Sequence, residues 1–361
     1  MTNAPRVLVS GVCLGQPMGG VRRHNAELLP RVDERLRADG GGLAVLEGTT
    51  TIAFELPDSI ERIASDVPYQ PAPRRALYES RALGRALDAA SRAGRPFDLV
   101  HTAHLPAPRS LAVPYTLTIH DLRSLDLDSA PFVRRLVGDR VVGGAIRGAR
   151  RVLTVSEAMR ERIREGFPGA RGRVDVVGNG ADHLPLQPRE PADPPFLLHV
   201  GHVEPRKNLE QLVRALAVDA SLPRVVLAGG AKGAELERLF ELATELGVRG
   251  RIDARADVDD AGLAALYAAA ACAVFPSRLE GFGIGPAEAL RADCPTAVSD
   301  VPAHREVTGD AAERFALDDP DALVAAVARA RSRRSKNVAV PRWDECADRW
   351  TAALVVATRT T

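Results

Sequence analysis

The sequence has little that would place it in a membrane. No apolar run in its 361 residues approaches the roughly 20 residues that a spanning helix needs. Its start, MTNAPRVLVSGV, passes from a short polar stretch directly into a strand-like run, without an apolar signal segment or a small-residue cleavage site. We therefore expect a cytoplasmic protein.

Cysteine pairs and an excess of positive charge are also missing. The four cysteines lie far apart, with no CxxC pair and no histidines at zinc-ligand spacing, so we expect structural thiols. The formal net charge is +1, whereas nucleic-acid-binding proteins carry a clear basic excess that neutralises phosphates. The sequence predicts neither a zinc site nor a nucleic-acid partner.

Lysine is rare: of the 48 basic residues only Lys207, Lys232 and Lys336 are lysines. An ammonium is a compact point charge, whereas the guanidinium of arginine is a planar fork. A position that keeps lysine against this bias is therefore a candidate for a site that needs a point charge.

What is present is a repeated alternation of strands and helices. Apolar, β-branched runs predict buried parallel strands at RVLVSGV, FDLVHT, YTLTIH, RRVLTVS and VDVV. After a proline-rich stretch, residues 184–196, the alternation restarts at FLLHVGH, RVVLAGG, RIDARADV, CAVFPS and PTAVSD. We expect an α/β protein with two doubly wound, Rossmann-like domains, residues 1–186 and 187–341, facing each other across a cleft. Residues 342–361 suit a helix that crosses back to the first domain.

The loop after the strand FLLHV carries two cations. In GHVEPRKNL, Gly201, Arg206 and Lys207 precede a helix-period segment for which Asn208 is a suitable N-cap. Anions bind at helix N-termini, and arginine and lysine add charge-assisted hydrogen bonds, so this loop suits a diphosphate. The alternative is an ordinary solvated basic loop.

A second motif, SRLEGFGIGPAEAL, follows the strand CAVFP and places Glu280 before a helix and Glu288 inside it. Pro286 suits the first turn of that helix, so both carboxylates can face a ligand lying across the helix start. Carboxylates suit ligands rich in hydroxyl groups, and the glycines allow backbone amides to approach closely. The candidate residues between the glutamates are Gly281, Phe282, Gly283 and Ile284. The alternative is one surface glutamate and one favoured by the helix dipole.

The first half has its own candidate residues. MGGVRRH places Gly19 and Gly20 between the first strand and a helix, where the backbone can approach a phosphate. The full GxGxxG fingerprint is absent, which argues against a dehydrogenase. His120 ends the strand YTLTIH on the side where ligands bind, with a satisfied structural histidine as the alternative.

Together these motifs resemble those of the retaining glycosyltransferases of family 4, which have the GT-B fold. The resemblance covers most of the chain: the GG loop, TIHDL, VSEAMRERI, VVGNGAD, GHVEPRKNL, the two glutamates and SDVPAHREVTGDAA. It implies that Arg206 and Lys207 bind the donor diphosphate, Glu280 the sugar hydroxyls and Glu288 the ribose.

The resemblance also implies roles for the remaining candidates. Gly20 would lie beside the donor phosphates and His120 beside the transferred sugar, while Gly283 and Ile284 would offer backbone amides. One departure is Gly178 in VVGNGAD, where the family commonly has proline, so we expect a looser loop there.

A DxD pattern, which holds a divalent metal in the other large glycosyltransferase fold, occurs at Asp126 and Asp128. It would face the acceptor, and the basic loop already supplies the charge that a metal would bring. The sequence therefore predicts no metal and no cofactor.

By resemblance, we expect an enzyme of polysaccharide biosynthesis that transfers a mannose-like sugar from a nucleotide-diphosphate sugar to a glycan or lipid-linked glycan. The alternatives on the same fold are a sugar-nucleotide epimerase, a phosphorylase and a non-catalytic nucleotide-sugar sensor. Residues 132–151 alternate arginines with apolar residues, which suits peripheral contact with the anionic inner face of a membrane. Ordinary packing on the first domain is the alternative for this stretch.

Overall fold

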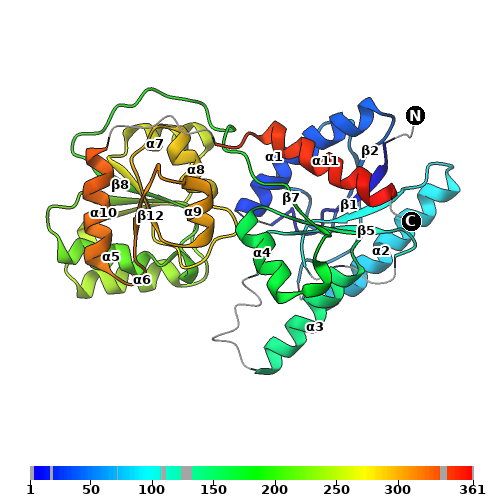
Figure 1. The fold of residues 1–361 in the computed structure, drawn as a ribbon, viewed down its shortest axis with the longest axis horizontal. Helices are drawn as coiled ribbons and strands as arrows, with labels where there is room; N and C mark the ends of the chain where they lie inside the picture. The colour runs from blue at the N-terminus through cyan, green and yellow to red at the C-terminus, as the bar shows by residue number, and fades with distance from the viewer. Residues whose placement is uncertain are drawn as a thin grey trace. The chain divides into compact units, whose positions relative to one another are not determined.

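The computed structural model describes residues 4–16, 19–70, 72–105, 107, 111–122, 132–333 and 340–359. The chain forms two compact units, Met1–Asn179 with Trp343–Thr361, and Gly180–Arg342. Each unit contains one parallel sheet with helices around it (Figure 1). The predicted pair of Rossmann-like parallel sheets is confirmed.

The first unit has a seven-stranded sheet in the order β3-β2-β1-β4-β5-β6-β7. Its strands are β1 (Arg6–Ser10), β2 (Gly42–Leu46), β3 (Glu61–Ile63), β4 (Leu99–Thr102), β5 (Tyr115–Ile119), β6 (Arg151–Thr154) and β7 (Val174–Val176). Its helices are α1 (Gly20–Ala38), α2 (Ala72–Arg92), α3 (Phe132–Gly148), α4 (Glu157–Gly166) and α11 (Trp343–Arg359). Because β2 and β4 lie on opposite sides of β1, the strand order reverses between β1 and β4, which is where doubly wound sheets bind ligands.

The second unit has a six-stranded sheet in the order β10-β9-β8-β11-β12-β13. Its strands are β8 (Phe196–Val200), β9 (Arg224–Ala228), β10 (Ile252–Arg255), β11 (Cys272–Phe275), β12 (Thr296–Ser299) and β13 (Glu313–Phe315). Its helices are α5 (Leu209–Val218), α6 (Glu235–Glu245), α7 (Asp260–Ala269), α8 (Ile284–Arg291), α9 (Pro302–Thr308) and α10 (Pro320–Ser332). Here the strand order reverses between β8 and β11.

The proline-rich stretch before β8 is packed against the second unit. Arg189 donates hydrogen bonds to the carbonyls of Ala268 (3.0 Å) and Ala270 (2.8 Å), and the amide of Ala192 donates to Ala269 (2.9 Å). The last carbonyls of a helix have no partner within it, so Arg189 and this segment satisfy the carboxyl end of α7. The stretch therefore belongs to the second unit, and the division of the chain lies before it.

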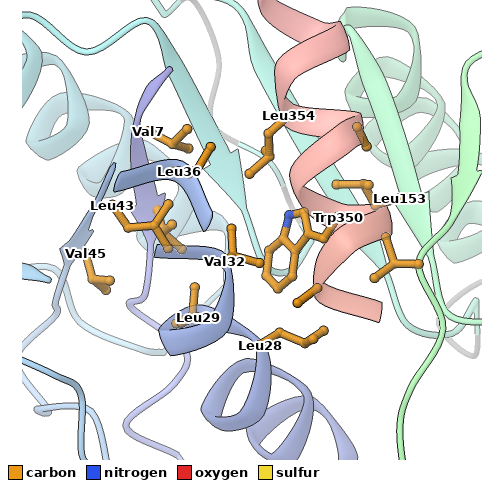
Figure 2. Close-up of a cluster of buried hydrophobic side chains, with 14 of the residues drawn as sticks. Val7, Leu28, Leu29, Val32, Leu36, Leu43, Val45, Leu153, Trp350 and Leu354 are labelled. Carbon is orange, nitrogen blue, oxygen red and sulfur yellow. The ribbon is translucent and has the colours of Figure 1, made fainter. Parts of the chain in front are cut away.

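The helix α11 is part of the core of the first unit. It packs along α1, and the indole of Trp350 lies beside Val32 of that helix (Figure 2). The buried face of α11 repeats at helical spacing through Trp343, Cys346, Ala347, Trp350, Ala353, Leu354 and Ala357. At its rim Arg35 pairs with Asp344 (3.2 Å) and Asp348 (2.5 Å).

Candidate active site

The loop between β8 and α5 presents two cations. Arg206 and Lys207 lie on a 3₁₀ turn, Pro205–Lys207, directly before α5. Gly201 begins the loop with a φ of 141°, and a Cβ placed on it would lie 3.5 Å from Lys207 Nζ. Glycine at this position therefore permits both the backbone conformation and the close approach of the ammonium.

Asn208 occupies the N-cap position of α5, but the expected capping hydrogen bond is absent. Its backbone is left-handed (φ 51°), a conformation that asparagine tolerates, and its side chain bonds elsewhere. Nδ2 donates to Gln211 Oε1 (2.9 Å), and Oδ1 accepts from Arg278 Nη2 (2.9 Å). Asn208 thus ties the loop of Arg206 and Lys207 to its neighbours instead of capping α5.

Gln211 uses all four hydrogen-bonding positions of its buried amide. Its Nε2 donates to the carbonyls of Ala316 and Asp319, both at 2.9 Å, and its Oε1 accepts from Asn208 and from the amide of Asp318 (3.1 Å). A buried amide that is fully paired joins its neighbours rigidly. The turn that carries Arg206 and Lys207 is therefore fixed to the loop before α10.

Glu280 brings the two predicted motifs together. It follows β11, and its two carboxylate oxygens lie 2.6 Å from Lys207 Nζ and 2.7 Å from Arg206 Nη1. Ser277 Oγ donates to the same carboxylate (2.7 Å), and the amide of Arg278 donates to the carbonyl of Arg206 (2.8 Å). The cations after β8 and the carboxylate after β11 thus meet where the strand order reverses.

The charges at this point shift each other's pKa. Burial alone would raise the pKa of the Glu280 carboxyl, but Lys207 and Arg206 outweigh burial and lower that pKa below its usual range. Burial lowers the pKa of Lys207, although Glu280 opposes the shift. Burial, and then the charge of Lys207, lowers the pKa of His199 to about 4, so this neighbour stays neutral. The site thus holds an ionised carboxylate in contact with two cations.

The helix α8 begins beside Glu280, as the sequence predicts. Gly283 is its N-cap with a φ of 101°, Ile284 is its first residue and Pro286 lies in its first turn. Gly281 and Phe282 complete the turn between Glu280 and the helix. The first amides of a helix have no partner within it and can meet an anion or a hydroxyl group.

Glu288 is buried within α8 and already has partners. Tyr267 Oη donates to its Oε2 (2.8 Å), and His183 Nε2 lies 3.0 Å from its Oε1. Burial, followed by the charge of Glu288, raises the pKa of Tyr267 well above its usual value, which keeps the phenol a donor. An ionised carboxylate has further lone pairs that can accept from a ligand hydroxyl.

In the first unit the structure brings His120 and the glycine loop together through His24. Gly19 is the N-cap of α1 and Gly20 its first residue, and His24 lies on the next turn. The rings of His24 and His120 meet edge to face at 4.7 Å, and His24 Nδ1 lies 2.7 Å from Asn179 Oδ1. Burial lowers the pKa of His24 to about 4 despite this hydrogen bond, so the His24 ring is neutral.

The comparisons with known proteins cover both units. The family described as "Glycosyl transferase 4-like domain" matches residues 19–180, and "Glycosyl transferases group 1" matches residues 183–340. The chain belongs to the GT-B glycosyltransferases. The resemblance that its motifs suggested is therefore confirmed.

Two curated relatives of this glycosyltransferase carry related names. An O-antigen chain mannosyltransferase of Salmonella typhimurium, RfbU, is 26% identical over 230 residues, which are 63% of this chain and 64% of the relative. The O-antigen chain mannosyltransferase B of Escherichia coli is 33% identical over 192 residues, which are 49% of this chain and 50% of the relative. The matched part thus spans between half and just under two thirds of the length of these two relatives.

A solved structure shares the fold over nearly the whole length of the glycosyltransferase. The sucrose-phosphate synthase of Thermosynechococcus elongatus superimposes with a TM-score of 0.72 at 20% identity, covering 98% of this chain and 97% of that one. At this identity the likeness shows the fold alone.

The sequence did not predict several residues that the structure places near the candidate residues. His183 and Tyr267 reach Glu288 from distant segments, and Trp350 packs near His24 (5.3 Å between ring centroids) from the end of the chain. Glu204 had a signal, because it directly precedes the turn that bears both cations.

The described residues contain neither a cluster of metal-binding side chains nor a helix suited to span a membrane. Within them, no group of three or more histidine, cysteine, aspartate or glutamate side chains could hold a metal ion, and the DxD pattern at Asp126 and Asp128 lies outside them. No helix in the same part of the chain is long and apolar enough to cross a membrane.

Proposed function

We propose that this glycosyltransferase transfers a sugar from a nucleoside-diphosphate sugar to a glycan or lipid-linked glycan. The observation that carries the proposal is the meeting of Arg206 and Lys207 with Glu280 where the strand order of the second unit reverses. Two cations beside a helix start suit a diphosphate, and a carboxylate at the same place suits sugar hydroxyls.

The reaction breaks the bond between the anomeric carbon and the diphosphate oxygen and forms a bond to an acceptor hydroxyl. Negative charge grows on the leaving oxygens, and Arg206, Lys207 and the amides at the start of α8 stabilise it. Because Glu280 is bonded to both cations, an arriving diphosphate competes with it for them, and a carboxylate oxygen of Glu280 that is released accepts from the sugar. The acceptor attacks from the face that the diphosphate leaves, and its proton passes to the departing phosphate, so the anomeric configuration is retained.

For the donor we propose a mannose-like sugar, supported by the names of the two O-antigen chain mannosyltransferases. The ribose would contact Glu288, and His120 would lie beside the transferred sugar. No metal is required in this proposal, because the basic loop supplies the charge.

The test is a screen of nucleotide sugars, GDP-mannose among them, by thermal shift, followed by product analysis with glycan acceptors in excess chelator. We expect the best ligand to yield free nucleoside diphosphate and a glycosylated acceptor. An isomerised nucleotide sugar formed without acceptor would favour an epimerase. Binding without turnover on any acceptor would favour a sensor. Loss of activity on chelation, with recovery on adding manganese, would favour a metal site at Asp126 and Asp128.

A further inference from the structure

Arg206 contacts a second carboxylate, that of Glu204, through the terminal nitrogen that does not bond to Glu280. Its Nη2 lies 2.6 Å from Glu204 Oε1, and the other oxygen of Glu204 pairs with Lys232 Nζ. The Glu204 side chain is 7% exposed, whereas that of Lys232 is 43% exposed. One buried carboxylate is thus shared between a cation of the donor site and a lysine of another loop.

The loop of Lys232 is fixed by main-chain contacts to the loop after β8 that carries Arg206 and Lys207. The amide of Val203 donates to the carbonyl of Gly230 (2.8 Å), and the amide of Lys232 donates to that of Val203 (3.0 Å). A β-bridge between Val203 and Ala231 extends the pairing of β8 with β9 past the ends of both strands. The backbone therefore holds Lys232 within reach of Glu204.

Donor binding competes with these contacts. Arg206 bonds to Glu204 through one nitrogen and to Glu280 through another, so it has to loosen at least one carboxylate to bind a diphosphate fully. A buried carboxylate that loses a cation is costly unless another cation remains. Glu280 keeps Lys207 and Ser277, and Glu204 keeps Lys232.

We infer that Lys232 is a positioning residue for the donor: by neutralising Glu204, it lets Arg206 turn from that carboxylate to the diphosphate. The inference rests on the proposed function. Lys232 acts without touching the ligand. When it is removed, Glu204 depends more strongly on Arg206, and the diphosphate competes against a tighter internal pair.

A double-mutant cycle tests this role, with inorganic pyrophosphate, UDP and GDP as probes in calorimetry. We expect Lys232→Met to weaken binding by about 2- to 160-fold, the range that corresponds to the coupling energies of residues that share a partner. Adding Glu204→Gln should restore binding, because the competing carboxylate is then gone. Glu204→Gln alone should bind at least as tightly as the wild type.

Arg255→Met is the matched control. Arg255 is the last residue of the neighbouring strand β10, is also 43% exposed and pairs with a carboxylate, Asp253 (2.8 Å), that is itself 41% exposed. The Arg255→Met substitution removes the same charge at the same exposure and leaves the contacts of Glu204 intact, so we expect unchanged affinity for the three probes. Thermal unfolding of every variant checks that the fold persists.

Three results would overturn the inference. If Lys232→Met binds like the wild type, Lys232 has no role in binding. If Lys232→Met is weak and Glu204→Gln fails to restore it, Lys232 contacts the ligand or supports the fold. If the wild type binds none of the three probes, the proposed function falls together with this inference, whereas the first two results leave the proposed function intact.

Discussion

Each sheet carries a buried carboxylate beside cations where its strand order reverses. In the second unit this carboxylate is Glu280, between Arg206 and Lys207. In the first unit it is Glu79 of α2, which accepts from Ser10 at the end of β1 and lies 3.7 Å from Nε2 of His104, just after β4. The two units thus place similar charges at corresponding positions of similar sheets.

The two clusters differ in whether solvent reaches the cations. The side chain of Arg75, which lies 3.9 Å from Glu79, is 4% exposed and that of His104 is 7% exposed, against 26% for Arg206 and 13% for Lys207. A sealed pair contributes to the fold, because breaking it leaves a buried charge. Partly exposed cations can exchange a protein carboxylate for a ligand. The same position in a Rossmann-like sheet can therefore serve stability or binding.

The largest effect is expected on catalysis when a cation of the second unit is removed. Arg206→Ala and Lys207→Ala should each lower kcat by about 10²- to 10³-fold, because each cation meets charge that grows in the transition state. Lys207→Arg should also be impaired, since a fork does not replace a point charge. Steady-state kinetics with the best donor measures these effects, and wild-type turnover in either alanine variant would contradict the site.

In the first unit, removing the carboxylate should affect stability instead. Glu79→Gln should lower the free energy of unfolding by about 3 to 5 kcal/mol, because it leaves buried cations unpaired. The matched control is Glu27→Gln on α1, whose pair with Arg31 is partly exposed and is expected to contribute about 0 to 1 kcal/mol. Urea unfolding gives both values. If Glu79→Gln weakens pyrophosphate binding without losing stability, the comparison between the units fails.

The pH dependence of stability should separate the units further. Burial lowers the pKa of His24 in the first unit and of His199 in the second to about 4. The stability that each neutral ring contributes to its unit is therefore fully present above pH 6.5 and is lost as the pH falls towards 4. For His104, Cys13 and Glu79 outweigh burial and raise the pKa to about 9. That contribution is present below pH 6.5 and is lost as the pH rises through 9.

Tryptophan fluorescence can follow the first unit alone, because both tryptophans lie on α11 in its core. Each of these histidines adds a slope of at most about 1.4 kcal/mol per pH unit. We expect an alkaline loss of stability in this signal, absent from His104→Gln. If the His104→Gln variant loses stability at alkaline pH as the wild type does, His104 is not the cause of that loss.

The smallest effect concerns the basic stretch of residues 132–151. Arg140 and Arg147 are exposed on α3, but Arg151 begins β6 and pairs with Asp175 (2.7 Å), so it is not part of the helix face. Contact with anionic vesicles would contribute about 1 kcal/mol per arginine and weaken with salt. Cosedimentation with anionic and neutral vesicles measures it, with the double variant Arg140→Ser and Arg147→Ser as the comparison. Equal binding to both vesicles would favour ordinary domain packing.

The sequence was informative where a strand is buried on both faces. Each of the ten predicted runs contains a strand, and eight of these strands lie inside a sheet, where parallel strands covered by helices are apolar. The edge strands β3 and β13 are three residues long and contain charged residues, so no apolar run marks them, and the buried strand β2 was not predicted either.

The residues of the candidate site likewise fall into those that the sequence predicts and those that it does not. The cations and Glu280 lie in local motifs, and the sequence predicts them. The contact of Asn208 with Arg278 and the partners of Glu288 join distant segments, which spacing along the chain does not encode.

The position of α11 affects the order in which the units assemble during synthesis. The first unit begins the chain, yet its core includes Trp343 and Trp350, which follow the whole second unit. Domains usually fold as their segments emerge from the ribosome. Here the second unit has all its strands before the first unit receives its last helix. We therefore expect the nascent first unit to expose the apolar face of α1 until translation reaches α11.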